Sequence, residues 1–153
     1  IATLLKAHPY EEVAYDVVSL ENEYATVGSG LVGNLRKPVD EIAFLKLLKR
    51  NLKTDCVRHT PLLGKQIQTV ALCGGSGRFL LNNAIGAGAD VYVSADFKYH
   101  EFFDADGKIV IADVGHFESE QFTKDLLVRH LSEKFPTFAV LLSKVNTNPV
   151  NYF

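Results

Sequence analysis

Residues 68–96, QTVALCGGSGRFLLNNAIGAGADVYVSAD, contain one complete strand–turn–helix–strand pattern. The apolar run 68–73 predicts a buried strand, GGSG (74–77) predicts a tight turn, and 78–88 predicts a helix. ADVYVSAD (89–96) then predicts a second strand. Strands that alternate with helices are typical of α/β proteins whose sheet is at least partly parallel, so this stretch decides the fold class.

The same alternation continues on both sides of this stretch. The other predicted elements, in chain order, are a short helix near Pro9, a strand at 16–20, a helix at 38–52, a strand at 55–60, a short helix or loop at 98–107, a strand at 108–115, a helix at 115–135 and a strand at 137–145. Residues 21–35 are a Gly-rich connection with some strand character, which we interpret as the boundary between two units. The whole pattern predicts a layered α/β sheet.

Composition excludes several classes of protein. The chain has 153 residues, 47% hydrophobic and 22% charged, which suits one globular domain with a core. A net charge of −2 and a pI near 6.2 do not indicate a nucleic-acid surface. No apolar run approaches the roughly 18 residues of a membrane span, and no signal peptide is visible, so we expect a cytoplasmic protein. The sequence has no Met and begins with Ile1, so we expect a fragment or a processed product.

The turn after the first strand is a candidate anion site. Gly74, Gly75, Ser76 and Gly77 lie between a strand and a helix, where backbone N–H groups can hold a phosphate. The turn lacks the Lys-Ser/Thr of a P-loop and the spacing of GxGxxG. A tight turn without a ligand is the alternative.

A second polar cluster, SADFKYHE, follows the next strand. It brings Asp96, Lys98, His100 and Glu101 close together at a strand end, where ligands gather in α/β sheets. Ionisable side chains of several types at such a position make Asp96 and His100 candidate catalytic residues. The alternative is an ordinary solvated loop.

The third cluster is DVGHFESE (113–120). His116 and Glu120 are four residues apart, so on a helix they project from the same face and can bind one divalent cation. Asp113 and Glu118 are nearby, but the alternation of side chains points them elsewhere. Two ligands do not complete a metal site, and such a pair also occurs in ordinary surface helices.

Three phrases in this order resemble one known family. AHPYEEVAYDV (7–17), then LCGGSG (72–77) with GADVYVSADFKYHE (88–101), then DVGHFESE (113–120), are similar to the GTP cyclohydrolase 1 type 2 homologs, also called Ngg1-interacting-factor-3-like proteins. The closing SKVNTNPVNYF (143–153) is similar to the usual C-terminus of that family. The resemblance covers essentially the whole chain.

The resemblance implies an architecture. Long members of the family have two α/β lobes with a ferredoxin-like insert between them that resembles PII and CutA proteins. Residues 1–30 then correspond to the end of this insert. Residues 31–153 correspond to the second lobe, a layered αβα unit with a mixed, partly parallel sheet. The family also implies a ring-shaped homohexamer whose metal sites face an internal cavity.

The resemblance also implies site residues. His116 and Glu120 match metal ligands of the second lobe, and Asp96 and His100 match residues around the site. The full-length site holds two divalent metal ions, which can be Zn, Mn or Fe. The first lobe supplies a paired-histidine motif and an aspartate, and this chain has no HH pair. We therefore expect the chain to carry half of a metal site.

Two functions are consistent with these expectations. In the first, the full-length protein is a metal-dependent hydrolase of a nucleotide-like or phosphorylated small molecule, with His100 carrying a proton. In the second, the protein is a non-enzymatic metal-binding scaffold or regulator. In either case the fragment alone is expected to be inactive, and nothing in the sequence selects GTP as substrate.

Overall fold

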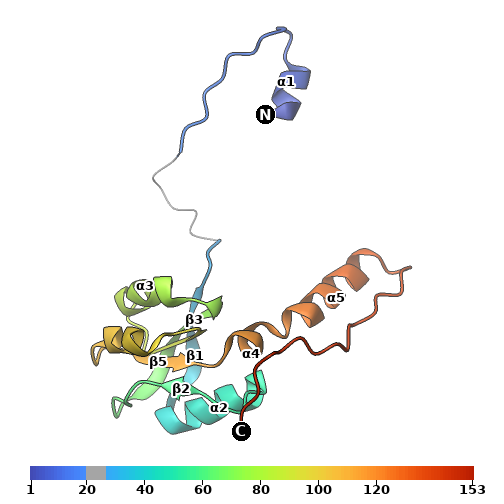
Figure 1. Ribbon diagram of the computed structural model, residues 1–153. Helices are drawn as coiled ribbons and strands as arrows, with labels where there is room; N and C mark the ends of the chain where they lie inside the picture. Colours follow the sequence, from blue (N-terminus) through green and yellow to red (C-terminus); the bar gives the residue numbers. More distant parts are fainter. Residues whose placement is uncertain (20–26) are drawn as a thin grey trace.

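The computed structural model describes residues 1–19 and 27–153, and it contains one mixed sheet (Figure 1). The strands are β1 (Leu31–Asp40), β2 (Arg58–His59), β3 (Gln66–Ser76), β4 (Val91–Ala95) and β5 (Val110–Asp113). The helices are α1 (Ala2–Ala7), α2 (Glu41–Leu52), α3 (Leu81–Gly86), α4 (His116–Glu120) and α5 (Thr123–Lys134), with 3-10 helices η1 (Arg78–Leu80) and η2 (Tyr99–Ala105).

The strand order is β1-β3-β4-β5-β2. β3, β4 and β5 run parallel in the middle, whereas β1 pairs antiparallel with β3 and β2 pairs antiparallel with β5. The predicted α/β class and partly parallel sheet are confirmed. Since the three central strands are parallel, their carboxyl ends lie at one edge of the sheet, and the three polar clusters follow these ends.

Side chains that alternate along the central strands build a core on each face of the sheet. Tyr92 packs in a cluster with residues of α3, while its neighbours Val91 and Val93 pack in a cluster with Phe44 of α2. In β5, Ile111 likewise lies on the α3 side. The sheet is therefore a middle layer between helices, because a strand presents successive residues to opposite faces.

The helix predicted at 38–52 begins later than expected. Asp40 is the N-cap of α2, and its carboxylate accepts hydrogen bonds from the backbone N–H groups of Ile42 (2.9 Å) and Ala43 (3.1 Å). Pro38 belongs instead to the last part of β1, which is an edge strand where a missing N–H is tolerated. The strand character expected within 21–35 is found from Leu31 onward. Of the strand predicted at 55–60, only Arg58 and His59 form β2.

In the first twenty residues a short helix is present, but it lies before Pro9, and the predicted strand is not found where the structure describes the chain. α1 ends at Ala7, before Pro9 rather than after it. His8 is extended, with ψ 139°, because a proline disfavours the helical conformation of the preceding residue. Residues 13–19 form no strand, and position 20 of the predicted strand lies outside the described residues.

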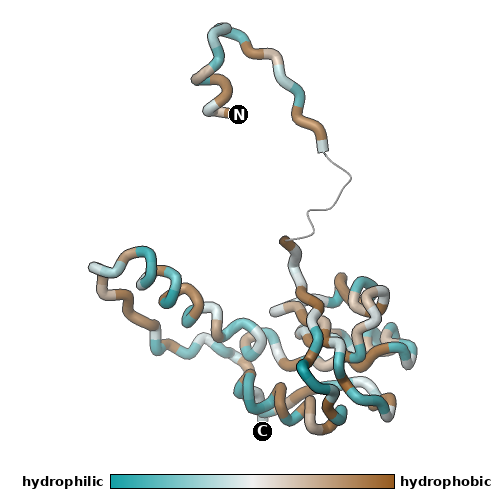
Figure 2. The backbone as a smooth tube through the Cα atoms, turned by 180° about the vertical axis from the view of Figure 1, so that it is seen from behind, coloured by the Kyte–Doolittle hydropathy of each residue, from teal (hydrophilic) through white to brown (hydrophobic). Residues whose placement is uncertain are grey.

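The single helix predicted at 115–135 is divided into α4 and α5. The break follows Gln121, whose Nε2 donates to the carbonyl of Leu52 at the end of α2 (2.7 Å). The strand predicted at 137–145 is wrong, because α5 carries the chain away from the sheet and this segment pairs with no described strand. It returns beside α5 and carries apolar stretches (Figure 2).

No helix in residues 1–19 and 27–153 has the length and apolar character to cross a membrane.

Gly77 is packed tightly against side chains of the core. A Cβ atom there would lie 2.2 Å from Ser94 Oγ and 2.5 Å from Tyr92 Oη, and the Tyr92 hydroxyl already donates to the Gly77 carbonyl at 2.6 Å. The backbone of Gly77 has an ordinary φ of −108°, so only the lack of space requires glycine.

We expect Gly77→Ala to lower the free energy of unfolding by about 1–3 kcal/mol, the usual cost of overpacking a core. Gly86→Ala is the matched control, because nothing lies within 4 Å of a Cβ there. Alanine at this helical position should be neutral or stabilise by about 0.5–1 kcal/mol. Urea unfolding measures both, and equal stabilities of the two variants would contradict the packing argument.

Candidate metal centre

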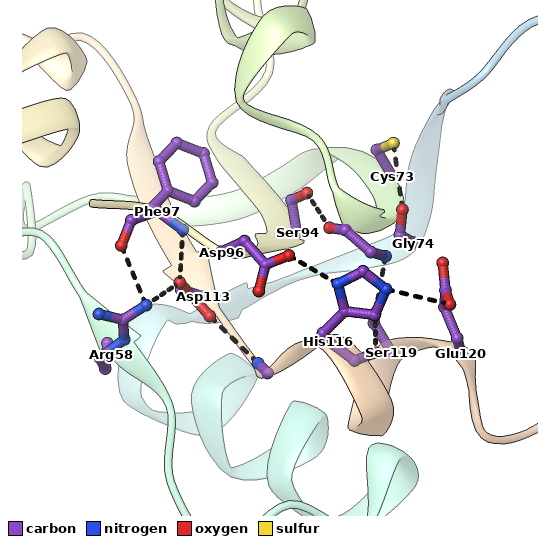
Figure 3. A network of polar contacts seen from close by, with 12 residues as sticks. Arg58, Cys73, Gly74, Ser94, Asp96, Phe97, Asp113, His116, Ser119 and Glu120 are labelled. Carbon is purple, nitrogen blue, oxygen red and sulfur yellow. Dashed lines mark hydrogen bonds and ion pairs between the residues drawn. The ribbon is translucent and has the colours of Figure 1, made fainter. Parts of the chain in front are cut away.

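Loops from three strand ends meet at one edge of the sheet (Figure 3). Gly74 and Gly75 lie at the end of β3, Asp96 directly follows β4, and His116 begins α4 two residues after Val114. The structure thus brings together three of the residues singled out from the sequence, Asp96, His116 and Glu120.

His116 lies between two carboxylates. Its Nδ1 is 2.6 Å from Asp96 Oδ2, and its Nε2 is 3.3 Å from Glu120 Oε2. His116 and Glu120 are half-exposed and one helical turn apart, as their spacing predicts. Asp96 has φ 61°, an uncommon left-handed conformation for a residue other than glycine, and this conformation accompanies its contact with the imidazole.

The Asp96 contact sets the protonation of His116. The hydrogen bond that His116 Nδ1–H donates to Asp96 raises the pKa of His116 above its ordinary 6.5, and the charges of Asp96 and Glu120 add to this effect. The folded pKa lies above the unfolded one, so the protonated pair stabilises the fold fully below pH 6.5. That contribution is lost as pH rises through the raised pKa. In the neutral ring, a proton on Nδ1 bonded to Asp96 leaves the Nε2 lone pair free.

Gly75 lies directly beside the side chains of His116 and Glu120. It has φ 63°, and a Cβ there would lie 2.5 Å from Glu120 Oε1 and 3.2 Å from His116 Nε2. Its N–H donates to Ser119 Oγ (2.8 Å), and this hydroxyl donates to the His116 carbonyl (2.8 Å). The positive φ favours glycine here, and a Cβ would displace the Glu120 carboxylate from its place beside the imidazole.

The role of GGSG (74–77) as a phosphate loop stays a prediction. One of its N–H groups, that of Gly75, is already occupied by Ser119, and the turn does not line the cleft described below. The tight turn predicted at 74–77 is wrong for its first three residues, because Gly74, Gly75 and Ser76 form the end of β3, and Gly77 alone leads into η1. In this structure the end of β3 contacts α4 through Gly75 and Ser119.

Asp113 is the main polar residue that the sequence reasoning set aside. Its carboxylate is buried, pairs with Arg58 and accepts hydrogen bonds from the backbone N–H groups of Phe97 (3.0 Å) and Gly115 (3.1 Å). These two backbone groups directly follow Asp96 and directly precede His116. Alternation correctly points Asp113 away from the His116–Glu120 pair. Arg58 lies within the strand predicted at 55–60 and Asp113 within the strand predicted at 108–115, but the sequence did not predict that these strands pair. In the sheet the two residues lie directly opposite each other.

A cleft of about 800 Å³ opens beside His116 and Glu120, and C-terminal residues form part of its wall. Asn148 Nδ2 donates to Oε1 of the buried Glu118 (3.1 Å), which ties this segment to α4. Burial, followed by the charge of Glu118, raises the pKa of Tyr152. No chemical role was predicted for these residues from the sequence, because they are far from α4 along the chain.

His100 is on η2 and its side chain is exposed. It makes no hydrogen bond or ion pair with a cleft residue in the part of the chain that the structure describes. The expected proton-carrying role of His100 therefore stays a prediction.

The chemistry of the pair fits a divalent metal ion. A neutral imidazole nitrogen and a carboxylate oxygen are ligands for Zn, Mn and Fe, and a histidine ligand commonly gives its other N–H to a carboxylate, as His116 does to Asp96. Among residues 1–19 and 27–153 there is no group of three or more His, Cys, Asp or Glu side chains arranged to hold a metal. This chain thus offers two donors and an orienting carboxylate.

Sequence comparison finds close similarity to one family. Residues 1–149 match the family described as Duf34/NIF3 (NGG1p interacting factor 3). The chain is 36% identical over 157 residues to the GTP cyclohydrolase 1 type 2 homolog of Halalkalibacterium halodurans, covering 99% of this chain and 42% of that protein. The homolog of Bacillus subtilis is 33% identical over 158 residues, with the same two coverages. The chain spans about 42% of the length of these relatives.

Solved structures of related proteins are also similar to this chain. A Bacillus cereus protein related to NIF3 superimposes with a TM-score of 0.72 at 33% identity, over 99% of this chain and 43% of that one. The Staphylococcus aureus protein SA1388 superimposes with a TM-score of 0.75 at 26% identity, over 99% of this chain and 50% of that one.

We expect Asp96→Asn to lower the pKa of His116 toward 6.5, because the amide keeps a polar group beside Nδ1 but removes the negative charge. NMR titration of the imidazole signals measures this shift. Asp104→Asn is the control, since Asp104 pairs with Arg78 instead. An unchanged titration of His116 in the Asp96 variant would show that the contact does not set its protonation.

Proposed function

We propose the following function from the premise that this chain belongs to the Duf34/NIF3 (NGG1p interacting factor 3) family. The chain contributes His116 and Glu120 to a divalent-metal site. The full-length protein uses that site to hydrolyse a nucleotide-like or phosphorylated small molecule. The relatives named GTP cyclohydrolase 1 type 2 homologs suggest a hydrolytic reaction, and nothing in the cleft selects GTP.

The contact between His116 and Asp96 is the observation that carries this proposal. At 2.6 Å it fixes the imidazole so that Nε2 faces Glu120, 3.3 Å away, at the border of the cleft. An ordinary surface pair on a helix has no need for a third residue that orients it. The left-handed backbone of Asp96 supports the same interpretation, because strained positions concentrate at functional sites.

The chain's own residues have separate tasks in this scheme. Asp96 holds the proton of His116 at Nδ1, which leaves the lone pair of Nε2 available as a metal ligand. Glu120 supplies a carboxylate oxygen as a second, hard ligand. Gly75 keeps both close to the end of β3 because it carries no side chain. When bound, a divalent metal ion lowers the pKa of a coordinated water and polarises a phosphoryl or carbonyl oxygen.

Donors from outside the described residues complete the site in this proposal, because two protein ligands are fewer than a zinc site normally has. We assign residues 1–30 to the end of a PII-like insert and residues 31–153 to the lobe that carries half of the site. Two metal ions per full-length site and a homohexamer are part of the same proposal. The lack of a three-ligand group in the described chain supports the need for further donors.

We expect the chain to bind Zn²⁺ or Mn²⁺ weakly and to lose this binding in His116→Ala and in Glu120→Ala. Calorimetric titration of chelator-treated protein measures the affinity, and elemental mass spectrometry gives the metal content. His130→Ala on the exposed face of α5 is the control and should bind metal like the original chain. Equal metal affinity in all four proteins would refute the assignment of His116 and Glu120.

Turnover is tested on the full-length protein with a panel of nucleotides and phosphate esters. Hydrolysis that requires metal and disappears in His116→Ala supports the hydrolase. Metal binding without turnover of any compound would favour the non-enzymatic scaffold.

A further inference from the structure

Arg58 lies at the end of the cleft that is opposite Glu120. Figure 3 shows Arg58 at one side of the polar network and Glu120 at the other, with Asp113, Asp96 and His116 between them. Arg58 lines the same cleft as His116 and Glu120, and 55% of its side chain is exposed. No role has been given to this guanidinium in the metal scheme.

Arg58 is held rigidly on one side. Its Nη2 donates to the Phe97 carbonyl (3.0 Å) and pairs with the carboxylate of Asp113, whose side chain is only 2% exposed. The guanidinium carbon lies 5.5 Å from the ring centroid of Phe102, which holds the plane of the group. A guanidinium fixed in this way loses little conformational entropy when it binds a ligand.

The other nitrogen atoms of Arg58 are available. Nε and Nη1 make no hydrogen bond with any residue in the described part of the chain. A structural arginine that only neutralised Asp113 would not need to lie half-exposed in a cleft. Planar N–H donors facing solvent match the oxygens of a phosphate group.

The charges in the cleft separate into two ends. Asp113 is compensated by Arg58 and two backbone N–H groups, Glu118 is bonded to Asn148, and Asp96 is bonded to His116. In the described part of the chain Glu120 pairs with the imidazole of His116, and it attracts a cation at its end. An anion is therefore repelled there. The cleft has two cations, Arg58 and Lys124, and Arg58 is the one with fixed planar donors that match a phosphate group.

We propose that Arg58, oriented by Asp113, binds the phosphate group of a small-molecule ligand in this cleft. The inference rests on the proposed function, since it names the group that the substrate carries, and it gives the anion-binding role to Arg58 rather than to the GGSG turn. The ligand spans the cleft, with its phosphate at Arg58 and its reacting part toward His116 and Glu120.

Inorganic phosphate is the probe. It is titrated into chelator-treated chain at constant ionic strength, set with sodium chloride, and the Arg Nε–H signals are followed by NMR. We expect the Arg58 signal to move and phosphate binding to weaken about tenfold or more in Arg58→Gln and in Arg58→Lys, since both lose the guanidinium donors. Lysine keeps a positive charge beside Asp113, so the second variant remains informative if the first is unstable.

Arg78→Gln is the matched control, because Arg78 also pairs with an aspartate, Asp104, but does not line the cleft. It should bind phosphate within about twofold of the original chain, a difference well below that of one charge-assisted hydrogen bond. Phosphate binding that is equal in both Arg58 variants and the original chain, or absent from the original chain, would overturn the proposal.

The same titration is repeated with Zn²⁺ or Mn²⁺ present, which separates this inference from the proposed function. Binding that depends on Arg58 without any metal affinity would support the anion site and refute the metal site. Metal affinity without a contribution from Arg58 to phosphate binding would support the metal site and refute the anion site.

Discussion

The buried carboxylate of Asp113 determines how the loops at the site are arranged. A charge removed from water is costly unless it is paired and hydrogen-bonded, and Asp113 obtains its partners from three separate segments. These are β2 through Arg58, the loop after β4 through Phe97, and the loop after β5 through Gly115. Satisfying one carboxylate therefore fixes Asp96 and His116 relative to each other, although Asp113 touches neither imidazole nor metal-binding atoms.

Close packing of the backbone against side chains positions α4 next to the end of β3. The end of β3 lies against α4, and Gly75 occupies a position where a Cβ would come within 2.5 Å of Glu120 Oε1. Ser119 bonds this end of β3 to the first turn of α4 from the other side. The three central strands therefore each contribute one contact to the same small region, which follows from their parallel order.

The central parallel strands could be predicted from the sequence, but the contacts between distant segments around them could not. Period-two alternation in β4 and β5 and the Gly-rich turn before α3 are local signals, and they predicted the parallel core. The spacing of His116 and Glu120 predicted their common face. The helix is divided next to Gln121, whose side chain donates to the carbonyl of Leu52, and the segment at 137–145 follows α5 without pairing with a described strand. Contacts between residues so distant in the chain have no local signal, which is also why Arg58 and Asn148 were not singled out.

Contacts between protein groups arrange the side chains of the candidate site. Asp96 orients His116, Gly75 and Ser119 position α4, and Asp113 joins the loops, all through protein groups. A small zinc domain that folds only around its ion obtains its folding free energy from the ligands themselves. Here the sheet and its two apolar clusters supply the core, so the candidate site does not depend on an ion for its folding free energy. Under the proposals above, a ligand of this preformed cleft would lose little affinity to reorganisation of the protein, and Glu120 at one end and Arg58 at the other would set its selectivity.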